Sequence, residues 1–484
     1  MENSKPSSTS SHVGWSSLTK DQGEKMSPET WLNSMLIYNT DPHDWEKPSL
    51  TGQCHLFRTV VSKDPDKFIG LIHEIINNEK VQLAYPQSGM QGLLDAGRTD
   101  DAMKVLGEIL DVIGHDVNST VRGFSLHSLL FALNDIPKMD HVPEIVVRLF
   151  CNALLNAKEP EEDRHKDEKD VHTIGINQVR GNAGYMLVEC AQEVKYKEAI
   201  FSTIESIAKT ASVYTRAAIL LNMAALNFLD KDRNVALFKK LMYDYNPRLM
   251  ALPVHNYNPL VYFINYAVED LMDYFEHAAD CPSCYQGQVV ILWLAWSHNN
   301  KNERIKVLLD KMCDTSQVAR ISLLEFLCTL DEKMNEDALG YIINFMEPEF
   351  DSQEMGNACD NLFHHAKDWS DDIQRRVAEA FVASPASKHK ISVFIEFLAG
   401  YAIKDPVQTL RWLEQTISDD MLDEYYNWNH VTDVLIQSYN GIKSFSDSSN
   451  KDTLENAMDM IDALMQSPNN KNLISNFINK LDNE

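Results

Sequence analysis

The sequence predicts an all-α protein, built as an α-solenoid of antiparallel helix pairs. Apolar residues recur at the helical period i, i+4, i+7, i+8, i+11 and i+15, as in the stripe formed by Val213, Ala217, Leu220, Leu221, Ala224 and Phe228. Gly (18) and Pro (17) are scarce for a chain of 484 residues, which favours helices over a turn-rich β fold. So long a chain exceeds one compact core, whereas the core of a solenoid grows along one axis.

The helical pattern divides the chain into five segments: a flexible tail at 1–26, N-terminal helical repeats at 27–157, an acidic loop at 158–170, central helical repeats at 171–346 and C-terminal helical repeats at 347–484. Ser27 and Pro28 have the residue types of an N-cap and a first helical position, so they predict the first helix start. A clean apolar stripe over 102–113 predicts a helix there, and another helix is expected through 120–133.

The formal net charge of −27 and the pI near 4.9 limit the classes of partner. An acidic chain without extended Lys/Arg runs repels phosphate backbones, so nucleic-acid binding is not expected, and acidic membrane surfaces are disfavoured for the same reason. The longest apolar run, residues 289–296, is too short to span a bilayer, and the N-terminal residues lack the apolar core of a signal peptide. We therefore expect a cytoplasmic protein with a protein partner.

The eight cysteines mostly lie inside apolar helical patterns, which is typical of reduced, buried thiols in a reducing compartment. Cys281 and Cys284 form a lone CxxC motif. A zinc site would need two more ligands, for which His277 and His298 are the candidates, and a redox role usually has a βαβ setting. We therefore interpret the motif as a turn between helices and expect no bound metal.

A local pattern marks the starts of several helices: an oxygen-bearing residue precedes an arginine by six positions. The pairs are Asp116 with Arg122, Thr210 with Arg216, and Asp314 with Arg320. The first residue would cap the inner helix of a pair, and the arginine would bond to a nearby carboxylate or carbonyl. This pattern resembles that of HEAT repeats, which implies a right-handed α-solenoid. The arginines at 122, 180, 216, 320 and 376 are unevenly spaced, so we expect degenerate repeats with insertions.

The segment INQVRGNAGYML, from Ile176 to Leu187, carries a second resemblance. It is similar to an INxVRGxA helix in the C-terminal helical-repeat region of bacterial STAND-type, NACHT-like NTPases, and other segments between residues 13 and 484 resemble that region too. We expect Asn177, Arg180 and Gly181 to serve helix–helix contact. In that family the region follows an ATPase module and is regarded as a sensor. This sequence has no P-loop motif, so the resemblance implies either a free-standing sensor-like solenoid or a separately encoded C-terminal piece.

These observations predict a non-catalytic protein-binding scaffold or sensor that uses no cofactor. The alternative is a sensor piece of a bacterial anti-phage defence STAND NTPase that acts with an ATPase in trans. An enzyme with a nonstandard site is disfavoured, because the sequence shows no HExxH, GxSxG or kinase motif, and His364 and His365 fit a helix with one ring in the core and one in solvent. The expected anchor for a partner is an aromatic cluster: Tyr425, Tyr426 and Trp428.

Overall fold

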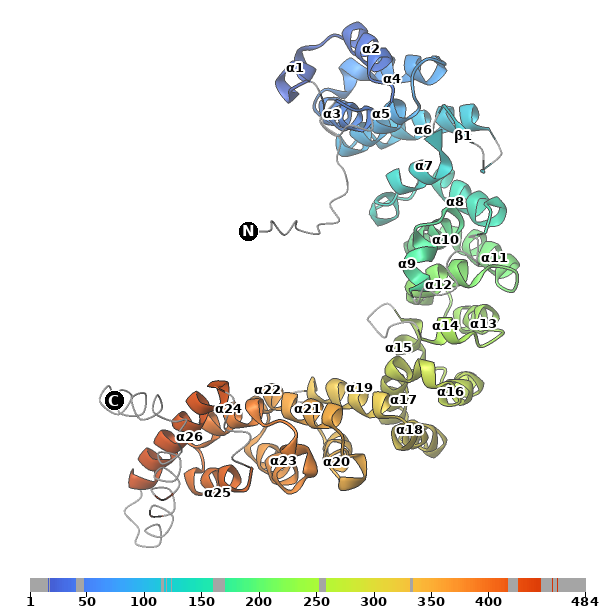
Figure 1. Ribbon diagram of the computed structural model, residues 1–484. Coiled ribbons are helices and arrows are strands. Elements are labelled where there is room, and N and C mark those ends of the chain that lie inside the picture. Colours follow the sequence, from blue (N-terminus) through green and yellow to red (C-terminus); the bar gives the residue numbers. More distant parts are fainter. Residues whose placement is uncertain are drawn as a thin grey trace. The chain divides into compact units, whose positions relative to one another are not determined.

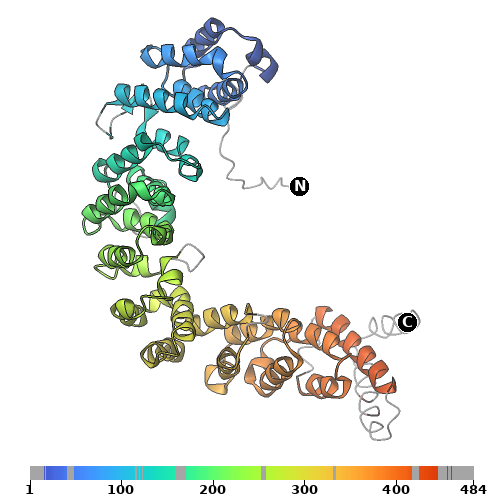
Figure 2. The same cartoon turned by 180° about the vertical axis from the view of Figure 1, so that it is seen from behind.

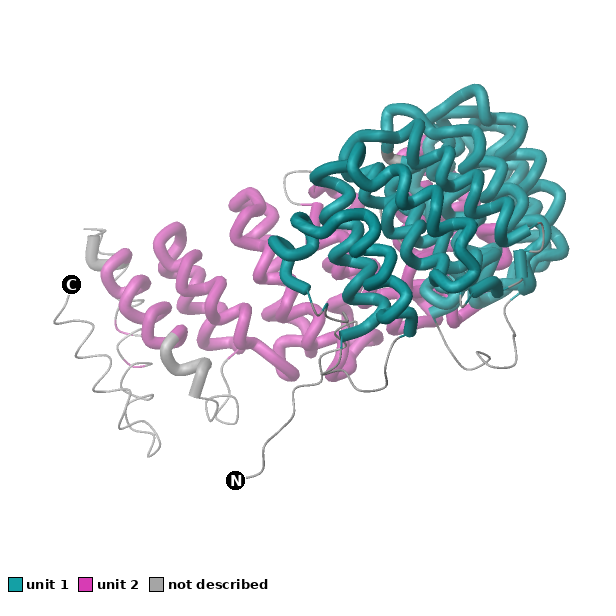
Figure 3. The backbone as a smooth tube through the Cα atoms, turned by 90° about the horizontal axis from the view of Figure 1, so that it is seen from above, with its two compact units in different colours: residues 1–270 teal, residues 271–484 magenta. Residues whose placement is uncertain are grey.

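The computed structural model describes residues 16, 18–40, 48–114, 117–118, 120–122, 124–159, 170–251, 258–330, 334–416, 425–444, 455 and 459, with only the backbone at 138, 425–429 and 442–444. Helices account for 76% of the described residues and strands for very few, so the fold is all-α, as predicted. The chain divides into two compact units, residues 1–270 and 271–484 (Figure 3). Among the described helices, none has the length and apolar character that crossing a bilayer requires.

The first unit begins with six helices: α1 Lys20–Lys25, α2 Pro28–Ile37, α3 Leu50–Lys63, α4 Pro65–Asn77, α5 Ala84–Asp95 and α6 Thr99–Ile113 (Figure 1). Ser27 caps α2 as predicted, since its side chain accepts from the Thr30 N–H at 3.2 Å. The expected flexible tail is wrong in part, because residues 20–25 form α1. The indole Nε1 of buried Trp31 donates to the Gly23 carbonyl at 3.0 Å, which ties α1 to α2.

The expected helix through 120–133 is also wrong in part. Thr120–Val121 (β1) and Phe124–Ser125 (β2) pair as a short antiparallel hairpin, and helix α7 covers only Leu126–Ala132. The physical reason lies at Arg122, whose φ of 49° places it in the left-handed region that a helix excludes. After α7 come the 3₁₀ turn η1, Ile136–Lys138, and helix α8, Glu144–Asn156.

The rest of the first unit consists of helices α9 to α15: α9 Val171–Ile176, α10 Val179–Glu189, α11 Lys197–Ile207, α12 Val213–Asn222, α13 Lys231–Leu241, α14 Pro247–Met250 and α15 Pro259–Phe263. The 3₁₀ turns η3 Cys190–Gln192 and η4 Val194–Tyr196 connect α10 to α11, and η5 Met223–Phe228 follows α12. The predicted apolar stripe is therefore wrong at its last residue, Phe228. The α-helix stops at Asn222, the period changes, and the side chain of Phe228 is 86% exposed.

The second unit contains α16 Met272–Ala279, α17 Tyr285–His298, α18 Glu303–Thr315, α19 Gln317–Cys328, α20 Glu336–Asn344, α21 Gln353–Asn361, α22 Phe363–Ala366, α23 Asp371–Ala383, α24 Ser392–Tyr401, α25 Pro406–Thr416 and α26 Tyr425–Ser444. Part of its core is a cluster of phenylalanines contributed by α22, α23 and α24. Phe363 lies 5.1 Å from Phe381 and 4.7 Å from Phe394, measured between ring centroids.

Within each unit, helices that are close in sequence lie side by side (Figures 1 and 2). The most extensive contacts join α3 with α5, α5 with α6, α8 with α10, α9 with α12, and α10 with α12 in the first unit, and α17 with α18, α17 with α19, and α24 with α26 in the second. A core built from such neighbouring contacts is what a solenoid requires. The solenoid arrangement itself stays a prediction.

Candidate functional site

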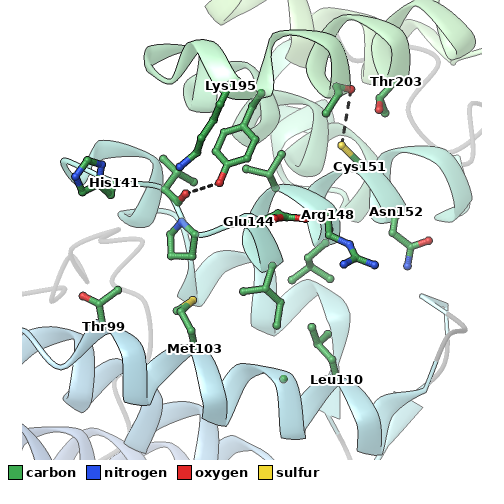
Figure 4. Close-up of a pocket in the computed structure, with 18 of the residues that line it drawn as sticks. Thr99, Met103, Leu110, His141, Glu144, Arg148, Cys151, Asn152, Lys195 and Thr203 are labelled. Atoms are coloured by element: carbon green, nitrogen blue, oxygen red, sulfur yellow. Dashed lines mark hydrogen bonds between the residues drawn. The ribbon is translucent and has the colours of Figure 1, made fainter.

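A groove of about 1640 Å³ lies in the first unit between α6 and α8, and η4 and the start of α11 border it (Figure 4). We call it the α6–α8 groove. Its α6 wall includes Met103, Gly107 and Leu110, at positions i, i+4 and i+7 of one helix face. In Figure 4, Met103 and Leu110 point from α6 toward α8. The α8 wall includes Ile145 and Leu155, of which Leu155 is 42% exposed.

The groove exists because α6 has two apolar faces. One face buries Ala102, Val105, Leu106, Ile109 and Ile113 and packs against α4 and α5. Met103 and Leu110 lie outside that buried face and are only partly covered. At Gly107 helix α6 comes close to α8, since an added Cβ would lie at contact distance, 3.7 Å, from the Ile145 side chain. The other apolar side chains of the groove, Met103, Leu110 and Leu155, are only partly covered.

Charged side chains flank the apolar walls in an asymmetric way. Asp100 and Asp111 are exposed on the α6 side, whereas Arg148, Lys195 and Glu144 are exposed on the side of α8 and η4. Lys195 also forms an ion pair with Glu193, and the hydrogen bond between them raises the pKa of the Lys195 ammonium. The α6 edge of the groove is therefore negative, whereas the edge formed by α8 and η4 carries both signs of charge.

The remaining polar groups of the groove hold its walls in place. The Tyr196 hydroxyl donates to the Val142 carbonyl at 2.8 Å, which fixes η4 to the segment that precedes α8. Cys151 of α8 has its Sγ 3.9 Å from the Ala199 carbonyl, and burial raises the pKa of its thiol. Because only the thiolate is a strong nucleophile, Cys151 is not an activated cysteine at neutral pH. The groove thus offers binding surface and a protonated thiol.

Arg216 lies at the fourth position of α12 and is only 4% exposed. Its guanidinium donates to the Leu241 carbonyl at 2.8 Å and forms a bidentate pair with the Asp244 carboxylate. The hydrogen bond from Arg216 holds the pKa of Asp244 below its usual range. The predicted cap is corrected: Ser212, not Thr210, accepts from the Thr215 N–H and begins the helix.

Arg320 lies at the corresponding position of α19. Its Nη1 donates to the Cys313 carbonyl at 2.6 Å, and its guanidinium lies 4.4 Å from the centroid of the Phe350 ring. Asp314 does not cap α19, because it is still part of α18. The cap is Ser316, whose side chain accepts from the Ala319 N–H.

Arg122 lies in the hairpin turn rather than near the start of a helix, which corrects the predicted position. Its guanidinium donates to the carbonyls of Ile76 and Asn78 at 2.6 Å and of Val81 at 3.0 Å, so it satisfies the orphan carbonyls around the end of α4. Asp116 lies outside the described residues. The helix-start pattern therefore includes three arginines that bond to carbonyls, but two of its proposed caps, Thr210 and Asp314, are not the residues that cap α12 and α19.

Gly181, Arg180 and Asn177 lie where α9 meets α10. A Cβ at Gly181 would lie 2.2 Å from the Gly175 carbonyl oxygen, so only glycine allows this approach of the two backbones. Arg180 donates through Nε to the Leu154 carbonyl at 2.8 Å, and Asn177 ends α9 with its carbonyl 3.0 Å from Nε2 of His127. These three residues contribute to contacts between helices.

Glu159 lies in the segment 158–170 that is predicted to be an acidic loop, and it contacts the neighbouring helices. Its carboxylate accepts from the hydroxyls of Ser212 and Thr215 at 2.6 and 2.8 Å, and it pairs with Arg180 at 2.9 Å. The residue therefore joins the end of α8 to α10 and α12. Residues 160–169 lie outside the described part of the chain.

Two other predicted features give no site. His364 and His365 are both exposed, so the expectation of one core-facing ring is wrong, because α22 is a single short turn. The side chains of Tyr425, Tyr426 and Trp428, the predicted anchor, lie outside the described residues. In the part of the chain that is described, no group of three or more His, Cys, Asp or Glu side chains has the arrangement of a metal site.

Comparison with known protein families, with curated proteins and with solved structures finds no match to this chain. The resemblances to HEAT repeats and to STAND NTPases therefore stay predictions from the motifs. Sequence reasoning also missed the α6–α8 groove. Its signal was present in the stripe over 102–113, where Met103 and Leu110 extend the apolar face of α6 beyond the width that one core contact needs.

Proposed function

We propose that this chain is a protein-binding helical scaffold, and that the α6–α8 groove receives an amphipathic helix of its partner. The observation that carries the proposal is the pair of partly covered apolar walls, Met103 and Leu110 on α6 against Ile145 and Leu155 on α8. Apolar surface exposed in a groove and rimmed by charges is typical of a protein-interaction site. A helix that inserts its own apolar stripe would remove these side chains from water.

The dimensions of the groove favour a helix over a small molecule. Small-molecule sites usually enclose about 300–1000 Å³, which is less than the space between α6 and α8. Helix α8 has 13 residues, so the wall that it forms is about 20 Å long at a rise of 1.5 Å per residue. A partner helix of three to four turns fits that length and can present apolar residues at i, i+4 and i+7 against the matching positions of α6.

The two rims of the groove define the polar edges of this helix. Basic residues on one edge would face Asp100 and Asp111. The other edge would face Arg148, Lys195 and Glu144, so it would carry both acidic and basic residues. Such complementary charges set the orientation of a partner and its rate of association more than its affinity. The direction of the bound helix should therefore follow from its charge pattern.

Site-specific photo-crosslinking in the source organism tests the proposal. A photoreactive amino acid replaces Leu155 in the groove, and a matched variant carries it at Val307, an exposed apolar residue of α18. The proposal expects the crosslink at 155 to capture one partner, at a segment with an apolar helical stripe, and the crosslink at 307 not to capture it. Equal capture at both positions would contradict the groove as the binding site. A captured partner with a P-loop would favour the sensor that acts with an ATPase in trans.

A further inference from the structure

Cys281 and Cys284 lie together in the turn that joins α16 to α17. The Cys284 N–H donates to the Cys281 carbonyl at 2.9 Å, so the sequence Cys-Pro-Ser-Cys closes a tight turn. Their Sγ atoms are 2.8 Å apart. This approach brings the two thiols closer than separate side chains ordinarily come, and a covalent bond between them would need a shift of less than about 1 Å, to about 2.05 Å.

The two thiols differ in accessibility. Cys281 is partly exposed, whereas Cys284 is buried at the position that precedes the first residue of α17. Burial raises the pKa of the Cys284 thiol, so Cys284 is not the residue that attacks a dissolved reagent first. A dissolved reagent can therefore reach the sulfur of Cys281, and Cys284 is placed to react with Cys281 in a second step.

A metal site explains this pair less well than redox chemistry does. Zinc needs four ligands, and two thiols supply half of them. Within the described residues no third His, Cys, Asp or Glu joins the pair in a metal-binding arrangement, although His277 and His298 are both described. Two adjacent thiols without further ligands are suited to form a disulfide.

We propose that Cys281 and Cys284 are a reversible redox site that forms an intramolecular disulfide by exchange with a small-molecule disulfide such as oxidised glutathione. This site lies in the second unit, and its chemistry is independent of the α6–α8 groove. Cys281 is the attacking residue because it is accessible, and Cys284 is the resolving residue because its sulfur already lies beside that of Cys281.

The reaction balances in two steps. The Cys281 thiol loses a proton to solvent, and its thiolate attacks one sulfur of oxidised glutathione. The glutathione S–S bond breaks, a Cys281–glutathione mixed disulfide forms, and one glutathione leaves as a thiolate that takes up a proton. Cys284 then loses its proton and attacks Sγ of Cys281, which forms the protein disulfide and releases the second glutathione. The protein loses two electrons, and oxidised glutathione gains them.

Peptide mass spectrometry on the full chain tests this proposal. The chain is incubated with oxidised glutathione, free thiols are alkylated, and the peptide that contains residues 281–284 is analysed. We expect this peptide to carry an internal disulfide that reduced dithiothreitol removes. Cys151, which is also partly exposed, serves as the internal reference, and we expect it to remain alkylated under the same conditions.

Two variants separate the roles of the thiols. In Cys284→Ser we expect a stable glutathione adduct on Cys281, because no resolving thiol is present. In Cys281→Ser we expect no adduct on buried Cys284 over the same time. Circular dichroism checks that both variants keep their helical content. If either variant unfolds, the rates of alkylation of Cys281 and Cys151 are compared in the unmodified chain. Faster alkylation of Cys281 then supports the proposal, and slower alkylation contradicts it. The proposal is overturned if Cys281 and Cys284 stay alkylated in oxidised glutathione, or if Cys151 reacts first.

Discussion

The Arg216 guanidinium holds both carboxylate oxygens of Asp244, with Nη1–Oδ1 and Nη2–Oδ2 distances of 2.8 Å. The same Nη1 donates to the Leu241 carbonyl at the end of α13, and the guanidinium lies 5.0 Å from the ring centroid of Tyr243. One side chain of α12 thus fixes the segment that follows α13. Because Arg216 is buried, its removal leaves a carbonyl and a carboxylate without their donor.

The first prediction concerns the stability that Arg216 contributes. Arg216→Ala should lower the free energy of unfolding by about 2 kcal/mol, since hydrogen bonds to charged groups contribute about 1.5–3 kcal/mol and Asp244 is partly exposed to water. The urea midpoint, followed by circular dichroism, measures the loss. Arg304→Ala, which removes an exposed pair with Glu276, is the matched control and should shift the midpoint much less. Equal shifts would contradict the assignment.

The second prediction concerns pH. Arg216 lowers the pKa of Asp244 in the folded state. The stabilisation is therefore present above the unfolded pKa of about 3.9 and is lost as the pH falls through the lower folded pKa. The unmodified chain should exceed Asp244→Asn in stability at pH 7, and the difference should shrink below about pH 4. Urea midpoints between pH 7 and 3 measure this difference in stability. A difference that stays constant over that range would contradict the role of the Arg216–Asp244 pair.

The third prediction concerns Asp360, a carboxylate of α21 with an exposed fraction of 0%. Its oxygens accept from the N–H groups of Val393 and Phe394 at the start of α24, while burial raises its pKa. Asp360→Ala should cost about 1–2 kcal/mol, because two helix N–H groups lose their acceptor. Thermal unfolding at pH 7 measures the loss.

Asp360→Asn is the control for that loss, because its amide oxygen still accepts and carries no charge. The sign of the pH effect follows from the raised pKa: the proton-bound form is favoured in the folded state, so this contribution is present below the unfolded pKa and is lost as the pH rises through the folded pKa. Asp360→Asn should therefore gain stability relative to the unmodified chain as the pH rises from 4 to 7. If the unmodified chain instead gained stability relative to Asp360→Asn over this pH range, this account would be refuted.

The fourth prediction compares two glycines inside helices. Gly181→Ala should destabilise the chain by about 1–3 kcal/mol, because the new Cβ would lie 2.2 Å from the Gly175 carbonyl oxygen. Gly340 lies on the exposed side of α20, so the new Cβ of Gly340→Ala meets nothing within 4 Å and should stabilise the chain by about 0.5–1 kcal/mol through helix propensity. Shifts of the melting temperature in opposite directions would support the close packing at Gly181, and two shifts in the same direction would contradict it.

The sequence predicted most of the secondary structure, because apolar spacing and caps are local signals. Ser27 and its following proline mark α2 as expected, and the stripe at 102–113 gives α6. Local signals fail where the backbone leaves helical geometry. The positive φ of Arg122 and the change to a 3₁₀ turn before Phe228 are set by contacts with other helices, and the spacing of residues does not contain them.

The candidate site was harder to predict than the fold for the same reason. Whether Leu110 is covered depends on the distance between α6 and α8, which contacts between residues far apart in the sequence determine. The predicted roles of the arginines agree better with the structure, because a buried guanidinium needs hydrogen-bond acceptors wherever it lies in the fold. Arg122, Arg216 and Arg320 all bond to main-chain carbonyls, although only Arg216 also has a carboxylate partner in its hydrogen bonds.

The binding of the partner's crosslinked segment, made as a fluorescent peptide, tests the central claim most directly. Fluorescence anisotropy compares the unmodified chain with Leu155→Asp in the groove and with Val307→Asp outside it, after thermal unfolding shows that both variants fold. Placing a charge against an apolar helix face should weaken binding at least about tenfold, which is 1.4 kcal/mol. We expect that loss for Leu155→Asp and unchanged affinity for Val307→Asp. Equal affinity of all three proteins for the peptide would contradict the proposal that the α6–α8 groove binds the partner.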